Sequence, residues 1–235
     1  MAKVAKAGRQ LGNGKKEALR QTVLKVAAEL FAERGYAGTS LQDLADELGM
    51  SRPSLYYYFS SKEAILASLV EEVTVFSHRQ SERVAANPEA DPDESLRLLV
   101  RNHAKWLLEH SVQFRVVDRS ESELPEETRE VHNAAKRALL EDFTRLIAHG
   151  IQVGHFRGVD PRVAAFAMLG MCSWTAWWFK PDGRQTADAI ADMIADMALH
   201  SVRREGAKRS KIAEVGDAFQ MLRDDISRLE LLLKH

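Results

Sequence analysis

The sequence predicts an all-α protein: a small N-terminal helix-turn-helix domain, a larger helical domain and a final heptad helix. Three observations lead to this prediction. Apolar residues recur along most of the chain at the three- and four-residue spacing of a helix face. Two short periodic segments meet at Gly49 in the pattern of a helix-turn-helix. The chain has 235 residues, of which 45% are hydrophobic and 29% charged, so it can bury a sizeable core.

Composition and charge restrict the compartment and the kind of partner. Cys172 is the one cysteine, which excludes a disulfide framework and fits a reducing cytoplasm. We find no signal peptide and no run of about 18 apolar residues, so we expect a cytoplasmic protein without a membrane span. Residues 1–62 hold ten Lys and Arg against six Asp and Glu, a net +4 that leaves −5 for the rest. Only this basic head is expected to meet nucleic acid.

The chain begins with a stretch that is rich in glycine, alanine and lysine and lacks periodicity. We predict that residues 1–14 form a flexible basic arm, which either takes no part in binding or lies along DNA phosphates or in a minor groove. From Lys16 to Arg34 the apolar positions fit a helical stripe, and Gly35 ends that helix. The predicted helix-turn-helix domain therefore covers residues 15–62.

Residues 39–62 have the local signals of two short helices joined by a tight turn. Ser40 and Ser51 can cap the two helices, and Gly49 can take the left-handed conformation that ends the first. Pro53 suits the first turn of the second helix, where a missing N–H costs nothing. An ordinary helical hairpin is the alternative, but the three consecutive tyrosines cannot all be buried, because successive helical residues point about 100° apart. Their hydroxyls suit phosphate oxygens, which favours a DNA-reading helix.

An ordered set of residues in this region carries a family resemblance: Ala28–Phe31, Gly35, Thr39–Leu41, Leu44, Ala45, Leu48, Gly49, Ser51, Leu55, Tyr56, Phe59, Lys62 and Glu63. On these residues, positions 17–70 resemble the N-terminal domain of the TetR (tetracycline-repressor) family of bacterial transcription regulators. The resemblance implies contacts with DNA base edges from Arg52, Pro53, Ser54 and Tyr57. It implies phosphate contacts from Ser40, Gln42, Tyr56 and Lys62. The guanidinium of Arg52 can also bind guanine in bidentate fashion.

Beyond the head, residues 63–207 are predicted to form a helical ligand-binding and dimerisation domain. Periodicity predicts a short segment over 113–124 and helices from Glu63 to about Val84, from Asp93, from Pro125 to Gln152, over 162–179 and over 186–204. The helix over 162–179 is apolar all round, which predicts burial on all sides. The resemblance implies that it forms a four-helix bundle with 186–204 and the copies of both in a homodimer. A palindromic operator is expected, because two reading helices must reach major grooves about 34 Å apart.

Large apolar side chains of this domain are candidate walls of a ligand pocket: Trp106, Phe114, Phe143, Phe166, Met171, Trp174, Trp177 and Trp178. For any single one, a place in the core or at a dimer interface is the competing interpretation. Residues 173–183 look like a stretch of regulators that respond to acyl-CoA thioesters, which implies a small, largely apolar effector. Its phosphates would then meet cations among Arg115, Arg119, Arg137 and Lys180.

Catalytic and metal-binding patterns are missing from the sequence. The histidines form no His-x3-His pair and no cluster with cysteine, so we expect no metal and no other cofactor. There is no phosphate loop and no Gly-x-Ser-x-Gly motif, and Cys172 lies mid-way along an apolar helix. We therefore expect no enzymatic activity.

Residues 208–235 are predicted to form an additional heptad helix. Its apolar positions alternate at spacings of three and four: Ile212, Val215, Phe219, Leu222, Ile226, Leu229 and Leu233. The helix can pair with another chain or fold onto its own body. In a parallel dimer Asp225 would face Glu230 of the partner subunit, so antiparallel pairing or docking on the body is favoured.

Two functions remain open from the sequence. The first is a DNA-binding repressor that a small, largely apolar effector, such as an acyl-CoA, releases from a palindromic operator. The alternative is a ligand-independent DNA-binding dimer whose C-terminal helix recruits a partner protein. An apolar cavity beside Trp174 and Trp177 would favour the first.

Overall fold

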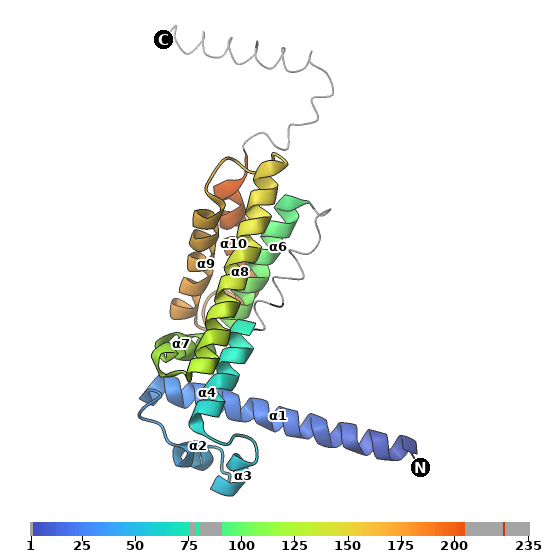
Figure 1. Ribbon diagram of the computed structural model, residues 1–235, viewed down its shortest axis with the longest axis vertical. Helices are drawn as coiled ribbons and strands as arrows, with labels where there is room; N and C mark the ends of the chain where they lie inside the picture. The colour runs from blue at the N-terminus through green and yellow to red at the C-terminus, as the bar shows by residue number, and fades with distance from the viewer. Residues whose placement is uncertain (1, 76–78, 80–90, 205–222, 224–235) are drawn as a thin grey trace.

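The computed structural model describes residues 2–75, 79, 91–204 and 223. Within these ranges the elements are helices, with one isolated antiparallel bridge between Phe156 and Arg203 and no strand. Figure 1 shows a head at one end of the molecule, in which short helices lie beside the long N-terminal helix, and a body of further helices above it. The predicted all-α fold is confirmed. Among the described residues, no helix has the length and apolar character that crossing a bilayer requires. The heptad helix predicted for 208–235 lies, apart from Arg223, outside the described residues.

Three helices form the head: α1 (Ala2–Arg34), α2 (Leu41–Glu47) and α3 (Arg52–Tyr56). They pack around one apolar core, which includes Val23, Ala27, Phe31, Leu44, Leu55 and Phe59. Ser40 and Ser51 cap α2 and α3 as predicted, since each hydroxyl accepts the backbone N–H three residues on. Gly35 and Gly49 have φ angles of +77° and +60°, the left-handed conformation that suits glycine after a helix.

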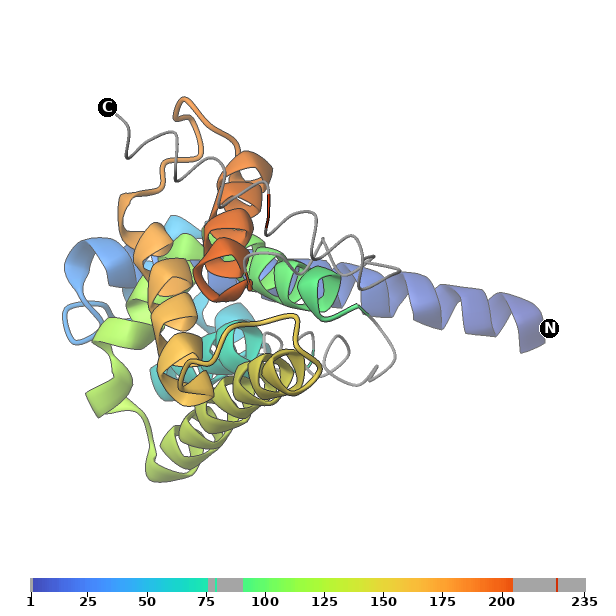
Figure 2. The same ribbon diagram turned by 90° about the horizontal axis from the view of Figure 1, so that it is seen from above.

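The structure corrects the conformation expected for residues 1–14, because α1 begins at Ala2. Once the segment from Lys16 to Arg34 is helical, each further residue adds a hydrogen bond without a new nucleation step. The alanine, lysine, arginine and glutamine of this stretch also favour helix, despite its three glycines. Figures 1 and 2 show the N-terminal part of α1 projecting away from the rest of the head and from the body as one continuous helix.

A wide helical turn links the head to the body. α4 (Lys62–Val70) buries four residues in the head core: Ile65, Leu66, Leu69 and Val70. It continues into η1 (Glu71–Val75), a turn of π-helix in which Val73 still belongs to that core. The predicted α-helix from Glu63 to about Val84 is therefore corrected over Glu71–Val75, where the geometry is π-helical, while Arg79 is again α-helical. One π-turn displaces the apolar spacing too little for the sequence to reveal it.

The body contains the remaining elements: α6 (Pro92–Glu109), α7 (Ser111–Arg119), η2 (Glu121–Glu123), α8 (Glu126–Gln152), α9 (Pro161–Trp178) and α10 (Ala187–Val202). The predicted start of a helix at Asp93 is corrected: α6 begins at Pro92, and Asp91 caps it, with its Oδ1 accepting the Asp93 N–H at 2.9 Å. α6 packs against α8, α9 and α10 around a core that includes the buried Phe143. α7 also packs against α1 and α4, so it joins the body to the head.

One apolar face of α9 and α10 remains exposed in the single chain. Val163, Phe166 and Trp174 of α9 are 65%, 55% and 67% exposed, and Met193 and Met197 of α10 are exposed as well. The expectation that the helix over 162–179 is buried on all sides is therefore not met within one chain. α9 packs on α6 and α8, and its exposed apolar side chains remain available to another molecule.

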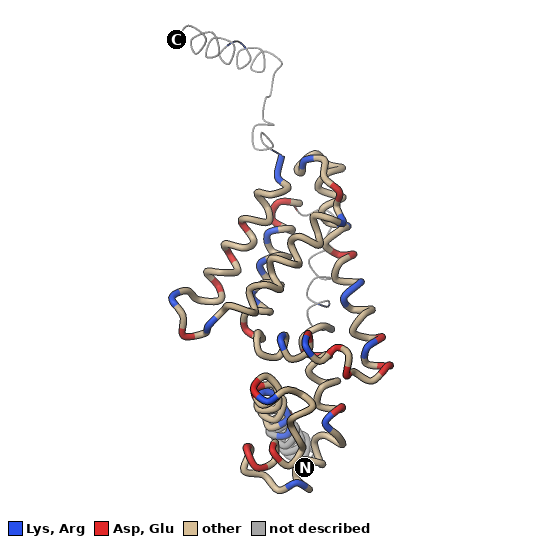
Figure 3. The backbone as a smooth tube through the Cα atoms, turned by 90° about the vertical axis from the view of Figure 1, so that its left-hand side faces the viewer, with Lys and Arg blue, Asp and Glu red and all other residues tan. Residues whose placement is uncertain are grey.

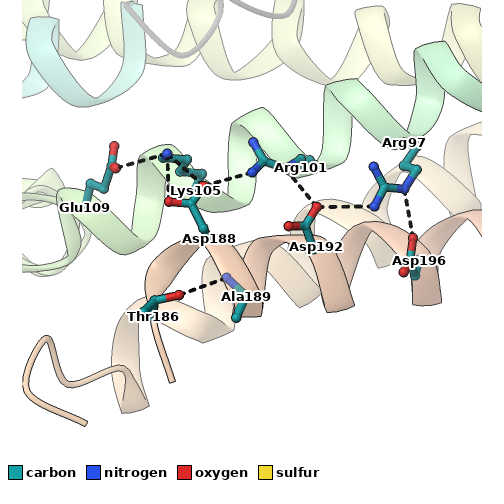
Figure 4. Close-up of polar contacts among 9 residues, drawn as sticks. All are labelled: Arg97, Arg101, Lys105, Glu109, Thr186, Asp188, Ala189, Asp192 and Asp196. Atoms are coloured by element: carbon teal, nitrogen blue, oxygen red, sulfur yellow. Dashed lines mark hydrogen bonds and ion pairs between the residues drawn. The ribbon is translucent and has the colours of Figure 1, made fainter. Parts of the chain in front are cut away.

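A ladder of ion pairs joins α6 to α10. Figure 3 shows a row of acidic positions on α10 beside basic positions of α6, and Figure 4 shows the contacts in detail. The pairs are Arg97 with Asp192 and Asp196, Arg101 with Asp188 and Asp192, and Lys105 with Asp188. Their N–O distances lie between 2.8 and 3.2 Å. Because the paired residues are four positions apart on both helices, they lie on one face of each helix.

Asp192→Asn is expected to lower thermal stability at neutral pH and to make stability less sensitive to acid. The hydrogen bond from Arg101 holds the pKa of the Asp192 carboxyl below its ordinary value of 3.8. A depressed pKa adds stability that is complete above the ordinary value and is lost as pH falls through the folded-state pKa. Thermal unfolding midpoints at neutral pH and in steps below about pH 4 measure both effects. Identical midpoints for the variant and the wild type at neutral pH would contradict a stabilising ladder.

Candidate DNA-reading surface and ligand cavity

α3 presents a polar and aromatic surface because one of its residues is anchored in the core. Leu55 is 1% exposed, whereas Tyr57 is 68% exposed. The first turn is set by Ser51, whose hydroxyl accepts the Ser54 N–H at 3.3 Å. The predicted DNA-binding residues of this helix and its C-cap are all exposed: Arg52, Pro53, Ser54, Tyr56 and Tyr57.

A shallow hollow of about 430 Å³ lies where α3 meets the starts of α2 and α4. It brings together four of the eight predicted DNA-binding residues: Ser40, Arg52, Tyr56 and Lys62. Arg52 Nη2 donates a hydrogen bond to the Tyr56 hydroxyl at 3.2 Å. The hollow therefore holds a guanidinium beside a phenol, a pair suited to a phosphate oxygen. Gln42 lies outside it and donates to Asp46 Oδ1 at 2.7 Å.

Two predicted phosphate contacts already have partners within the head. The Ser40 hydroxyl donates to Asp43 Oδ2 at 2.6 Å, which lowers the pKa of the Asp43 carboxyl. Lys62 Nζ donates to the backbone carbonyls of Tyr36 and Thr39 at 2.8 and 3.0 Å, and it lies 4.2 Å from the centroid of the Tyr36 ring. Lys62 thus ties α4 to the connector between α1 and α2. Phosphate binding by Ser40 or Lys62 must compete with these hydrogen bonds.

Lys62→Ala is expected to destabilise the head as well as to weaken DNA binding. The substitution removes the charged donor from two backbone carbonyls, at a cost of about 1–2 kcal/mol in the free energy of unfolding. If the side chain bound only DNA phosphates, its loss would lower DNA affinity without lowering the free energy of unfolding. Urea denaturation separates the two roles, with Lys25→Ala on the exposed side of α1 as a matched control. Equal unfolding free energies for the two variants would show that Lys62 does not stabilise the contact between α4 and the connector.

Two cations of α1 extend the reading surface. Lys16 Nζ lies 4.6 Å from the centroid of the Tyr57 ring. The guanidinium of Arg20 lies 4.9 Å from the Phe59 ring, and its Nη2 donates to Ser68 Oγ at 2.8 Å. Sequence reasoning did not single out Lys16 or Arg20, because only the fold brings α1 beside the end of α3. A cation over an aromatic ring is stabilised electrostatically, and Lys16 and Arg20 add positive charge next to the predicted DNA-binding residues.

A cavity of about 640 Å³ lies in the body between η1, α6, α7, α8 and α9. Its volume and apolar walls are typical of a small-molecule site. Its apolar walls include Leu107, Phe114, Leu140, Phe166, Trp174 and Trp177. Val73 and Val117 also line it, and both belong to the core of the head. Phe114 packs against the cores of head and body alike.

The structure brings four of the eight predicted pocket residues to this cavity: Phe114, Phe166, Trp174 and Trp177. The other four predicted residues do not line it. Phe143 is buried in the body core, Met171 packs against that core, and Trp178 is about half exposed at the surface. Trp106 stacks on His110 with ring centroids 3.5 Å apart. Helical register explains the split, because neighbouring positions on one helix point about 100° apart.

One wall of the cavity carries a chain of polar contacts. Thr74 Oγ1 and His132 Nδ1 are 2.9 Å apart, and both residues are buried. On the other side of the ring, His132 Nε2 is 3.6 Å from Glu121 Oε2, which pairs with Lys136 Nζ at 3.0 Å. Burial, and after it the charge of Lys136, lowers the pKa of His132 below 6.5, so the ring is neutral at neutral pH. Sequence reasoning missed this wall, because its members come from three separate elements.

Three exposed cations line the cavity: Lys136, Arg137 and Arg162. Of the four cations that the sequence suggested for ligand phosphates, Arg137 is the one found there. Arg115 Nη1 instead donates to the carbonyl of Ala176 at 2.7 Å, and Arg119 lies 5.0 Å from the Trp177 ring. Lys180 follows the end of α9 and does not line the cavity. Asp118 and Glu121 line it as well, so the cavity combines apolar walls with charges of both signs.

A separate polar cluster lies where α6 begins. In the part of the chain that the structure describes, Asp91, Asp93 and His155 have possible ligand atoms within 4.8 Å of one another. His155 Nδ1 is 3.2 Å from Asp93 Oδ1, and Arg203 Nε is 3.0 Å from Asp93 Oδ2. The Arg203 guanidinium supplies the positive charge that these carboxylates need, so the cluster joins α6 to the end of α10.

Two family models match the chain. One, described as bacterial regulatory proteins of the tetR family, matches residues 23–69. The other, described as a tetracyclin repressor-like C-terminal domain, matches residues 89–202. The two matches together span the helix-turn-helix and the cavity-bearing body.

Individual proteins are similar over most of the chain. The HTH-type transcriptional repressor KstR2 of Mycobacterium tuberculosis is 26% identical over 198 residues, which are 82% of this chain and 97% of that protein. PfmR, a TetR family transcriptional regulator from Thermus thermophilus, is 34% identical with a TM-score of 0.70, over 77% of this chain and 99% of PfmR. AibR, solved with isovaleryl coenzyme A and operator DNA, is 33% identical with a TM-score of 0.64, over 76% of this chain and 96% of AibR.

Proposed function

The chain belongs to the TetR family of bacterial transcriptional regulators, and from this premise we propose that it is a repressor that an amphipathic acyl-CoA thioester releases from a palindromic operator. The observation that carries the proposal is the apolar cavity of about 640 Å³, which shares Val73 and Val117 with the core of the head. A ligand in this cavity contacts residues on which the position of the head depends. Its binding free energy can therefore favour one head position over another.

The operator is read by α3. Arg52, Pro53, Ser54 and Tyr57 meet base edges, and their exposure around the anchored Leu55 supports this role. Phosphates are bound around the hollow that Arg52 and Tyr56 share, with contributions from Ser40, Gln42 and Lys62. The cations of α1 beside Tyr57 and Phe59 strengthen the attraction to the DNA backbone.

The repressor acts as a C2 homodimer through residues 162–179 and 186–204. The exposed apolar face of α9 and α10 supports this interface, because such a face is costly to leave in water. A two-fold axis places two copies of α3 on one side of the dimer. Two reading helices then bind successive major grooves about 34 Å apart, which makes the operator palindromic.

The effector is amphipathic. Aromatic walls such as Phe166 and Trp177 favour an apolar acyl group, and Lys136, Arg137 and Arg162 favour the phosphates of coenzyme A. The similarity to AibR, which was solved with isovaleryl coenzyme A, supports the same ligand class. Since the three cations are exposed, a large phosphorylated group can reach them while the acyl group lies inside.

Titration of a fluorescent operator tests this function. An operator is first obtained by in vitro selection with the purified protein, and anisotropy is then followed as isovaleryl-CoA, a long-chain acyl-CoA or free coenzyme A is added. We expect an acyl-CoA to release the DNA, and free coenzyme A to have little effect because it lacks the apolar group. If operator affinity is the same with every acyl-CoA, the effector class is wrong. If no DNA sequence is selected, the role as a repressor is wrong.

The alternative, a ligand-independent dimer with a partner-recruiting C-terminal helix, depends on residues 208–235, which lie outside the described residues apart from Arg223. Truncation after Arg209 distinguishes it. Loss of repression in cells with unchanged operator affinity and unchanged acyl-CoA response in vitro would favour the alternative.

A further inference from the structure

One buried hydrogen bond crosses from the segment that carries the head to the long helix of the body. Thr74 lies in η1, directly after Val73, which belongs to the head core. Its Oγ1 is 2.9 Å from Nδ1 of His132 on α8, and the two residues are 8% and 5% exposed. Both residues line the cavity. Because η1 continues α4, this hydrogen bond ties the head-bearing segment to α8.

The neighbours of the His132 ring decide which atom donates. The ring is neutral at neutral pH, so one of its nitrogens carries a proton and the other accepts. Nε2 faces the carboxylate of Glu121, which favours the proton on Nε2 and leaves Nδ1 as the acceptor. The Thr74 hydroxyl therefore donates to Nδ1. A hydroxyl has a single hydrogen, so Thr74 cannot donate to His132 and to a ligand at once.

We propose that the Thr74–His132 pair reads a polar oxygen of the effector, and that this oxygen displaces the hydrogen bond between η1 and α8. The inference rests on the proposed function and deepens it, because it specifies a chemical group of the effector. A carbonyl oxygen, such as that of a thioester, accepts the Thr74 hydrogen. A ligand hydroxyl instead donates to His132 Nδ1. Either event breaks the link between the head-bearing segment and the body.

The turn that holds Thr74 is suited to such a change. Single π-helical turns, with hydrogen bonds from residue i to residue i+5, are rare in proteins and occur frequently at functional sites. Loss of the Thr74 contact removes a restraint on this turn, and Val73 transmits the change to the head core.

Linkage gives the direction of the effect. Under the proposed function, effector binding lowers operator affinity, and effector binding breaks the Thr74–His132 hydrogen bond. The arrangement with the bond intact must then bind the operator more tightly. Removal of the Thr74 hydroxyl should therefore imitate the effector.

Thr74→Val tests the inference, because it removes the hydroxyl and nearly keeps the shape of the side chain. We expect operator affinity without added ligand to fall about five- to tenfold, the usual effect of losing one buried hydrogen bond. The further decrease caused by isovaleryl-CoA should shrink by a similar factor. Thr74→Ser restores a hydroxyl and should restore both values. Anisotropy of the operator, with and without isovaleryl-CoA, measures the affinity and the ligand-induced decrease for each variant.

Thr144→Val is the matched control. The Thr144 hydroxyl donates at 2.8 Å to the carbonyl of Leu140 within α8, and Thr144 does not line the cavity. This variant should keep the wild-type operator affinity. If it loses as much affinity as Thr74→Val, a general loss of stability explains the result and the inference is wrong.

Two further outcomes would overturn the inference. In the first, Thr74→Val has the operator affinity and the ligand-induced release of the wild type. In the second, Thr74→Ser behaves like Thr74→Val. The proposed function fails separately. If no acyl-CoA releases the wild-type protein, the acyl-CoA effector is wrong, but the titrations without ligand still decide whether the Thr74 hydroxyl couples the body to the head.

Discussion

Val163→Arg is expected to make the protein monomeric and to lower operator affinity by about 10²- to 10⁴-fold. Val163 is 65% exposed on the apolar face of α9, which the proposed dimer covers with a second copy. A guanidinium at this position must be desolvated without a carboxylate partner, so the two copies separate. A dimer binds the second half-site at high effective concentration, and a monomer loses that advantage. Light scattering gives the mass, and operator anisotropy gives the affinity.

A matched substitution shows whether the position matters. Val131→Arg on α8 changes a valine that is 50% exposed and does not line the cavity, and it should leave mass and affinity unchanged. Met197→Arg on α10 should reproduce the effect of Val163→Arg, because Met197 is 54% exposed within the same proposed interface. A dimeric Val163→Arg protein with wild-type affinity would exclude this face as the interface.

Arg52→Ala is expected to relax base preference at one position of each half-site, at a cost of about 1–3 kcal/mol in operator binding. Arg52 lies in the first turn of α3, where its guanidinium is exposed beside Tyr56. Bidentate hydrogen bonds to guanine distinguish it from the other bases, and alanine offers none. Titration of operators that carry each base in turn at every position of one half-site measures the change.

Two comparison variants make the assignment specific. Arg52→Lys keeps the charge but not the planar fork, so it should lose base preference while keeping most of the non-specific affinity. Lys16→Ala should weaken all sequences about equally and reduce the salt slope by about one. Identical rankings of operator variants for Arg52→Ala and Lys16→Ala would assign Arg52 to the phosphate backbone instead.

Under the proposed function, the position of the cavity explains how a ligand in the body can affect the head. Phe114 of α7 lines the cavity and packs against both cores, while α7 itself packs on α1 and α4. Val73 and Val117 line the cavity and also belong to the head core. Val73 and Val117 therefore connect the cavity wall to the head core, so a change in the wall changes the packing on which the head rests.

Local signals in the sequence determined the helices and the reading surface. Ser40 and Ser51 cap their helices with hydrogen bonds three residues away, and Gly35 and Gly49 adopt the left-handed conformation that ends a helix. These features depend on interactions within a few residues, so the pattern of residue types is sufficient to predict them. The exposure of α3 around Leu55 follows in the same way from helical periodicity.

Tertiary structure alone decided the cavity and the partners of the charged groups. Thr74 and His132 are 58 positions apart, and Lys62 binds carbonyls 23 and 26 positions away. Of the adjacent Trp177 and Trp178, the first lines the cavity and the second lies at the surface. Which face of a helix meets a pocket depends on how that helix packs against others, and helical spacing shows that a face is apolar without showing what covers it.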